Sequence, residues 1–161
     1  MLTKIGNRVL VMNYAHVAHN CKIGDDVILT NGAQIGGHCI IDEFANIEGM
    51  AGLHQFCRVG AHAIVAAGAK VAQDVPPYAM VAGAERARLV GINEIGLKRR
   101  GFTAETMNAL KAAMRTIFYS KLLREDALKK VLDEQGDFPE VRRLVDFIAN
   151  SPRGVVGRER E

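Results

Sequence analysis

Four histidines are the residues of this 161-residue chain best placed to do chemistry. His16 and His19 lie three residues apart in the segment HVAHNC, and His38 and His54 follow nineteen and then sixteen residues later. An imidazole can act as a general base near neutral pH, taking a proton from a hydroxyl or an amine. Three imidazoles can instead bind a zinc ion. Either chemistry requires the fold to bring these side chains together.

The element that positions them is a six-residue repeat. Residues 4–75 divide into twelve consecutive hexads, whose second residue is always Ile, Val or Leu and whose sixth is Ala, Val or Cys. This period fits neither an amphipathic helix nor a half-buried strand. It predicts three short parallel strands per coil of 18 residues, with coils stacked about 4.8 Å apart. Glycines follow the aliphatic residue where a tight corner needs no side chain, at Gly6, Gly24, Gly36 and Gly60.

Equivalent residues of successive coils share a face of such a prism, which puts the four histidines and Gln55 on one face. None of these histidines occupies an interior position of the repeat, so their side chains can converge on one cleft. The alternative is that they simply line a solvated face. Three cysteines, each 18 residues from the next, take the small interior position and predict a buried, unreactive ladder: Cys21, Cys39 and Cys57.

Beyond the repeat, the pattern stops at Pro76 and Pro77, which cannot donate to a strand ladder. We expect residues 78–91 to form an irregular last turn and exit loop. Helices are predicted from an N-cap at Thr103, over residues 125–135 before Gly136, and from Pro139 to a point before Pro152. Residues 154–161 look like a loose tail. The domains expected are a β-helix with its exit loop, 1–92, and a helical domain, 93–161.

The composition excludes several classes of protein. The net charge of +3 is too small for a nucleic-acid-binding arm. No run approaches the roughly 20 apolar residues of a membrane span, and the first residues lack the apolar core of a signal peptide. We therefore expect a cytoplasmic protein with no membrane span and no nucleic-acid partner.

Five motifs carry a resemblance to a known family. AHVAHNCKIG, QIGGH, GLHQF, QDVPPY and GLKRRGF occur in this order and are followed by helices. The chain thus resembles the UDP-N-acetylglucosamine O-acyltransferases of lipid A biosynthesis. The resemblance implies a mainly β fold, a left-handed parallel β-helix of hexapeptide repeats followed by a small α-helical C-terminal domain. It also implies a homotrimer with active sites between neighbouring prisms.

The activity implied is the first step of lipid A biosynthesis, in which a 3-hydroxyacyl group moves from acyl carrier protein to the 3-hydroxyl of UDP-N-acetylglucosamine. No cofactor is implied. By the resemblance, His19 is the general base and the Gly37 N–H is the oxyanion donor. The positions that match the substrate cleft are His16, His38, His54 and Gln55, and those that match the nucleotide contacts are Asn93, Arg99 and Arg100. Ala67 matches the residue that limits the acyl chain, and its methyl group should shorten the chain accepted.

Two features depart from the family pattern. Asn20 stands beside the base where many members have Asp, and an amide stabilises an imidazolium less well than a carboxylate does. Family members also begin with several more coils, so the chain is expected to be a fragment or a short form. Two alternatives remain open: a metal-dependent hydratase of the hexapeptide-repeat carbonic anhydrase type, and a truncated, non-catalytic trimeric scaffold.

Overall fold

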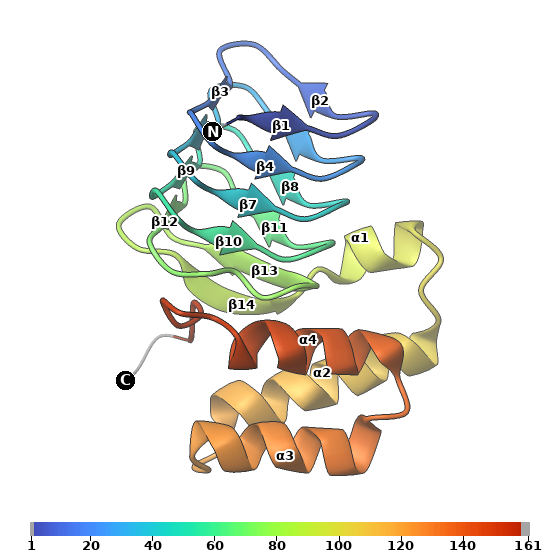
Figure 1. The fold of residues 1–161 in the computed structure, drawn as a ribbon. Coiled ribbons are helices and arrows are strands. Elements are labelled where there is room, and N and C mark those ends of the chain that lie inside the picture. Colours follow the sequence, from blue (N-terminus) through green and yellow to red (C-terminus); the bar gives the residue numbers. More distant parts are fainter. Residues whose placement is uncertain (1, 159–161) are drawn as a thin grey trace.

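The first half of the chain folds into the predicted coils. The computed structural model describes residues 2–158, and its first twelve strands are two residues long: β1 Lys4–Ile5, β2 Leu10–Val11, β3 His16–Val17, β4 Lys22–Ile23, β5 Ile28–Leu29, β6 Gln34–Ile35, β7 Ile40–Ile41, β8 Asn46–Ile47, β9 Gly52–Leu53, β10 Arg58–Val59, β11 Ile64–Val65 and β12 Lys70–Val71. They form three parallel sheets, β1-β4-β7-β10, β2-β5-β8-β11 and β3-β6-β9-β12, in which each residue pairs with its equivalent in the next coil, as Lys4 does with Lys22. Figure 1 shows these coils stacked as a prism.

The interior is filled by the aliphatic and the small residues of the hexads. Ile41, Ile47 and Val59 are buried, and so are all three cysteines. Burial raises the pKa of the Cys39 thiol to about 12 and that of Cys57 to about 11. Because the thiolate is the reactive form, the predicted unreactive cysteine ladder is supported.

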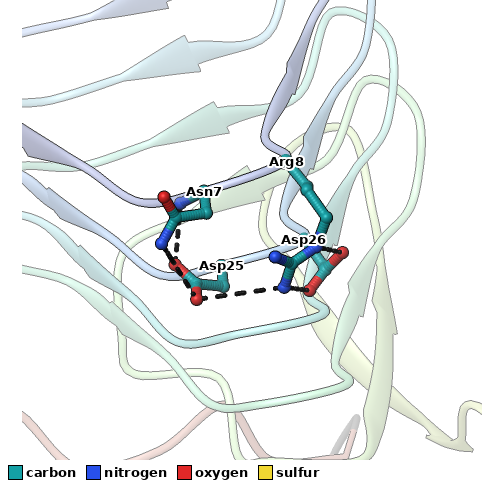
Figure 2. A network of polar contacts seen from close by, with 4 residues as sticks. All are labelled: Asn7, Arg8, Asp25 and Asp26. Carbon is teal, nitrogen blue, oxygen red and sulfur yellow. Dashed lines mark hydrogen bonds and ion pairs between the residues drawn. The ribbon is translucent and has the colours of Figure 1, made fainter.

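The tight turns at the corners need a residue with a positive φ, and the glycines that follow the aliphatic residues do not supply it. At the corner of every hexad except the last, one residue has a positive φ, and most of these residues are not glycine, as with Arg8 at 54° and Asp26 at 57°. The glycines instead allow close backbone approach, since a Cβ on Gly60 would lie 2.4 Å from Pro77 N. The corner side chains stack from coil to coil. In Figure 2 the Arg8 guanidinium donates to both carboxylate oxygens of Asp26, at 2.9 and 2.7 Å, and lowers the pKa of that carboxyl.

The expectation of an irregular loop over residues 78–91 is wrong. β13 (Ala79–Ala82) continues the second sheet, and β14 (Arg88–Ile92) runs antiparallel to β13. Ile64 of β11 pairs with Met80, whereas continued hexads would pair it with Ala82, so the repeat is lost although the ladder continues. Sequence periodicity therefore could not detect these strands.

Four helices follow: α1 Glu94–Arg99, α2 Ala104–Tyr119, α3 Arg124–Gln135 and α4 Pro139–Ala149. The three predicted helices are confirmed as α2, α3 and α4. Thr103 Oγ1 accepts a hydrogen bond from Thr106 N at 3.1 Å, and Gly136 is the C-cap of α3. Helix α1 was not predicted. Figure 1 shows α2, α3 and α4 beyond β14, at the end of the β-helix, and the described residues include no helix long and apolar enough to cross a membrane.

The prediction of a loose tail is wrong for the residues that follow α4. Val155 and Val156 are buried, and the segment pairs with Asp74: Asp74 N donates to Gly154 O at 3.1 Å, and Val156 N donates to Asp74 O at 2.8 Å. The segment has no repeat of its own and pairs with a strand edge that is distant in the sequence, which local composition cannot reveal. The rest of the predicted tail, residues 159–161, lies outside the described residues.

Candidate functional site

The corner that follows the third sheet brings His19, Gly37 and His38 together. The ring centroids of His19 and His38 are 5.1 Å apart in an edge-to-face arrangement. Gly37 lies directly against the His19 ring, because a Cβ there would be 2.8 Å from both Cε1 and Nε2. The two histidines belong to successive coils, and His38 N donates to His19 O at 3.0 Å. The imidazole ring of His19 therefore lies next to a backbone position, Gly37, that has no side chain.

The neighbour of His19 sets which of its nitrogens is basic. His19 Nδ1 is 3.3 Å from Asn20 Oδ1, an oxygen that only accepts hydrogen bonds. With that oxygen as the acceptor, Nδ1 carries the proton and Nε2 keeps its lone pair, on the side of Gly37. The Gly37 N–H donates to no acceptor within residues 2–158. The corner thus places the imidazole ring of His19 next to Gly37, whose N–H has no acceptor in this part of the chain.

Stacked rings hold His38. Its imidazole lies parallel to the Phe56 ring, at 4.6 Å between centroids and 17° between planes. Asn20, His38 and Phe56 are the three left-handed residues of this corner, with φ of 63°, 60° and 66°. The hexads did not single out Phe56, although its position one coil after His38 was the available signal.

The other residues predicted for this face divide into two groups. His16 is exposed on β3, opposite Gln34 of β6. His54 and Gln55 are exposed at the corner and lie against the C-terminal segment: Arg153 Nη1 donates to Gln55 O, and Arg153 Nη2 is 3.5 Å from His54 Nδ1. No sequence pattern indicated that Arg153 reaches this corner.

A groove of about 840 Å³ contains the residues predicted to contact the nucleotide. It lies between helix α1 and the outer face of the second sheet, and its lining includes Asn93, Arg99 and Arg100. Arg99 and Arg100 are exposed, and the Arg100 guanidinium lies 4.3 Å from the centroid of the Phe44 ring. This cation–π contact holds the Arg100 guanidinium over the Phe44 ring, at the rim of the groove.

Asn93 is already engaged at the base of this groove. Its Oδ1 accepts from Gly96 N at 3.1 Å and so caps α1, while its Nδ2 donates to His62 O at 2.9 Å. Asn93 therefore ties α1 to the β-helix. Another groove residue, Asn46, has a buried Oδ1 with no hydrogen-bond partner among the described residues.

The fifth histidine lies in the wall of the groove. His62 stacks between Phe44 and Tyr78, at 4.8 and 5.8 Å, and meets the edge of Phe102 at 5.0 Å. This burial lowers the pKa of His62 to about 4, which keeps the ring neutral near pH 7. The position of His62 one coil after Phe44 was the signal that could have identified this stack.

Ala67 lies at a third corner. It is exposed, and its N–H donates to the groove residue Glu48 at 3.1 Å. The structure thus gathers the predicted residues into two regions of one chain, the histidine corner beside the third sheet and the groove beside the second. In Figure 1, α1 lies on the side of β8 and β11, whereas β3, β9 and β12 are on the other side.

No metal site is preformed in the described part of the chain. Within residues 2–158, no three side chains of His, Cys, Asp or Glu are arranged to hold a metal ion.

Comparison with known families matches both halves of the chain. A family described as "Udp N-acetylglucosamine O-acyltransferase; Domain 2" matches residues 74–156, and one described as "Bacterial transferase hexapeptide (six repeats)" matches residues 2–37. The first match covers more than half of the chain.

Similar proteins carry the name acyl-[acyl-carrier-protein]--UDP-N-acetylglucosamine O-acyltransferase. The one from Herminiimonas arsenicoxydans is 42% identical over an alignment of 159 positions, and the match covers 96% of this chain and 60% of that protein. The one from Thiobacillus denitrificans is 39% identical over 155 residues, with the same two shares. The chain therefore spans about 60% of the length of these relatives.

Solved structures agree with this likeness. The UDP-N-acetylglucosamine acyltransferase of Francisella novicida superposes with a TM-score of 0.87 at 40% identity, over 96% of this chain and 56% of that one. The Arabidopsis enzyme gives a TM-score of 0.89 at 37% identity, over the same shares. The predicted fold class, a mainly β parallel β-helix followed by C-terminal helices, is confirmed.

Proposed function

Since this chain belongs to the UDP-N-acetylglucosamine O-acyltransferase family, we propose that it transfers a 3-hydroxyacyl group from acyl carrier protein to the 3-hydroxyl of UDP-N-acetylglucosamine. The similar proteins are named for an acyl-carrier-protein donor and this acceptor. The proposal carries over the activity for which these relatives are named, and this chain spans about 60% of their length.

The chemistry proposed begins at His19. Nε2 removes the proton of the sugar 3-hydroxyl while the oxygen attacks the thioester carbonyl, and a tetrahedral intermediate forms. The Gly37 N–H donates to the oxyanion of that intermediate. When the intermediate collapses, the C–S bond breaks, the new ester remains on the sugar, and the imidazolium returns its proton to the carrier thiolate.

One observation carries this assignment, the contact between Gly37 and the ring of His19. A Cβ at residue 37 would lie 2.8 Å from Nε2, so glycine leaves space beside the basic nitrogen where a reacting carbon can approach. Asn20 supports the same orientation through its contact with Nδ1 at 3.3 Å. His16, His38, His54 and Gln55 are proposed to contact the sugar along this corner.

The groove beside α1 is the proposed nucleotide site. Two exposed guanidinium groups, those of Arg99 and Arg100, line its rim and suit the diphosphate, since arginine binds phosphate through two charge-assisted hydrogen bonds. Asn93 is proposed to shape this site by capping α1.

The separation of the histidine corner from the groove supports a homotrimer. In one copy the two regions lie beside different sheets of the prism, whereas one UDP-sugar must reach both. Packing of neighbouring copies, corner against groove, unites them. The exposed basic residues Lys98, Arg99 and Arg100 would then also be available to an acidic carrier protein.

The test is acyl transfer from a panel of 3-hydroxyacyl carrier proteins to UDP-N-acetylglucosamine, with His19→Gln and Lys129→Ala in parallel. Lys129 is an exposed residue of α3 and should leave the rate unchanged. His19→Gln should lower kcat by roughly 10²- to 10⁴-fold, the range of a general base. Absence of product from the unmodified chain would contradict the proposed reaction. An undiminished rate in His19→Gln would remove His19 from the mechanism.

A further inference from the structure

The segment after α4 returns to the β-helix and ends its path beside the histidine corner. Asp74 fixes it, because this fully buried carboxylate accepts from Ser151 Oγ at 2.8 Å and its backbone pairs with Gly154 and Val156. Arg153 lies between these anchors. Its backbone position is thus determined by contacts that are independent of any ligand.

The Arg153 side chain contacts two adjacent residues of the corner. Nη1 donates to the carbonyl oxygen of Gln55, and Nη2 lies 3.5 Å from His54 Nδ1. The two partners lie far earlier in the chain, in the β-helix. A guanidinium has donors only, so the bond from Nη1 restrains the position of the Gln55 carbonyl.

The Gln55 carbonyl also restrains the histidine. His54 Nδ1 is 3.1 Å from that oxygen, a shorter distance than to Arg153 Nη2. A carbonyl oxygen only accepts, so with this oxygen as its partner Nδ1 carries the proton, Nε2 is left as an acceptor, and Arg153 Nη2 donates nothing to Nδ1. Arg153 fixes the carbonyl on which this tautomer depends.

We propose that Arg153 is a positioning residue, which holds the Gln55 carbonyl so that His54 presents Nε2 as a hydrogen-bond acceptor to the sugar. This inference rests on the proposed function for the identity of the ligand. It adds that the C-terminal segment is part of the substrate site, because the groups that orient His54 come from both the β-helix and the segment after α4.

The experiment compares Arg153→Met with Arg153→Lys. Met keeps the apolar stem and removes every donor, whereas Lys keeps the charge and one donor group. Ser151→Ala is the matched control for anchoring, since it removes one bond to Asp74 and leaves Arg153 intact. Thermal unfolding of each variant is measured first, so that kinetic constants are compared only between variants that are folded to the same extent.

Two readouts separate positioning from general stability. The first is the tautomer of His54, read from long-range ¹H–¹⁵N correlations of histidine-labelled protein. We expect the Nδ1–H form in the unmodified chain and in Arg153→Lys, and a shift toward the Nε2–H form in Arg153→Met. The second is steady-state kinetics. KM for UDP-N-acetylglucosamine should rise by up to about tenfold in Arg153→Met, the effect of losing one hydrogen bond between neutral groups, with kcat changed less than about threefold.

The outcomes are decisive in both directions. An unchanged His54 tautomer and an unchanged KM in a folded Arg153→Met would overturn the proposal, and so would a Lys variant as impaired as Met. Partial rescue by Lys, with a normal KM in Ser151→Ala, would establish it. The tautomer measurement requires no turnover, so an inactive unmodified chain would refute the proposed function and leave the role of Arg153 testable.

Discussion

Replacing Asp74 with alanine should destabilise the protein more than any single surface change. Asp74 is 0% exposed, and its carboxylate accepts from Arg58 N and from Ser151 Oγ, each at 2.8 Å. The first bond joins two coils of the β-helix, and the second joins the β-helix to the C-terminal segment. Alanine removes both acceptors and leaves both donors without their partner.

The magnitude follows from these two bonds. A hydrogen bond to a charged group contributes about 1.5–3 kcal/mol, so the two together contribute about 3–6 kcal/mol. Removing a buried charge also relieves its desolvation, which places the expected loss near the lower end, about 3 kcal/mol. That is a large share of the roughly 5–15 kcal/mol that stabilises a typical domain.

Urea unfolding at a fixed protein concentration, followed by circular dichroism, measures this loss. With a slope of about 2 kcal/mol per molar urea, the midpoint of Asp74→Ala should fall by about 1.5 M. Ser151→Ala, which breaks only one bond, should lose about 1.5 kcal/mol. A loss below about 1 kcal/mol in Asp74→Ala, or an equal loss in the two variants, would show that Asp74 does not link the coils to the C-terminal segment as argued.

Other predictions test the site. Gly37→Ala should fold but lose acyl transfer, since the new Cβ would lie 2.8 Å from the ring of His19; normal turnover would mean that the space beside Nε2 is not used. Arg100→Gln should raise KM for UDP-N-acetylglucosamine by roughly 10- to 100-fold, as expected for a charged contact to phosphate, with little change in folding; a normal KM would place the diphosphate elsewhere. Ala67→Gly should extend the acyl chain accepted, and an unmodified chain that already prefers the longest donors in a chain-length series would contradict this. The pKa of His62 is lowered from 6.5 to about 4 in the folded state, so the unfolded chain takes up a proton first as the pH falls, and the free energy of unfolding should decrease between about pH 6.5 and 4. His62→Phe should reduce that decrease in urea titrations at pH 7 and pH 5, and an identical decrease in both proteins would exclude His62 as its cause.

The sequence determined the features that depend on local pattern. Its hexads identify which residues enter the prism and which residues pair between successive coils, because the alternation of aliphatic and small residues has no other way to bury its apolar side. The same arithmetic predicted the cysteine ladder and the convergence of His19 and His38. Helix caps such as Thr103 could be recognised because capping uses only residues within one turn.

Only the tertiary structure decided the features that depend on distant partners. β14 forms because β13 has a free edge, and the C-terminal segment is held because it forms hydrogen bonds with Asp74. Neither segment carries in its own sequence a pattern that predicts its partner. Left-handed backbone at residues such as Arg8 and Phe56 is stabilised by the stacked coils against its local preference. Arg153 reaches His54 only because the helical domain turns the chain back under the last coil. A period can predict which face a residue occupies, but a contact between residues far apart in the sequence depends on how the helices pack against the β-helix.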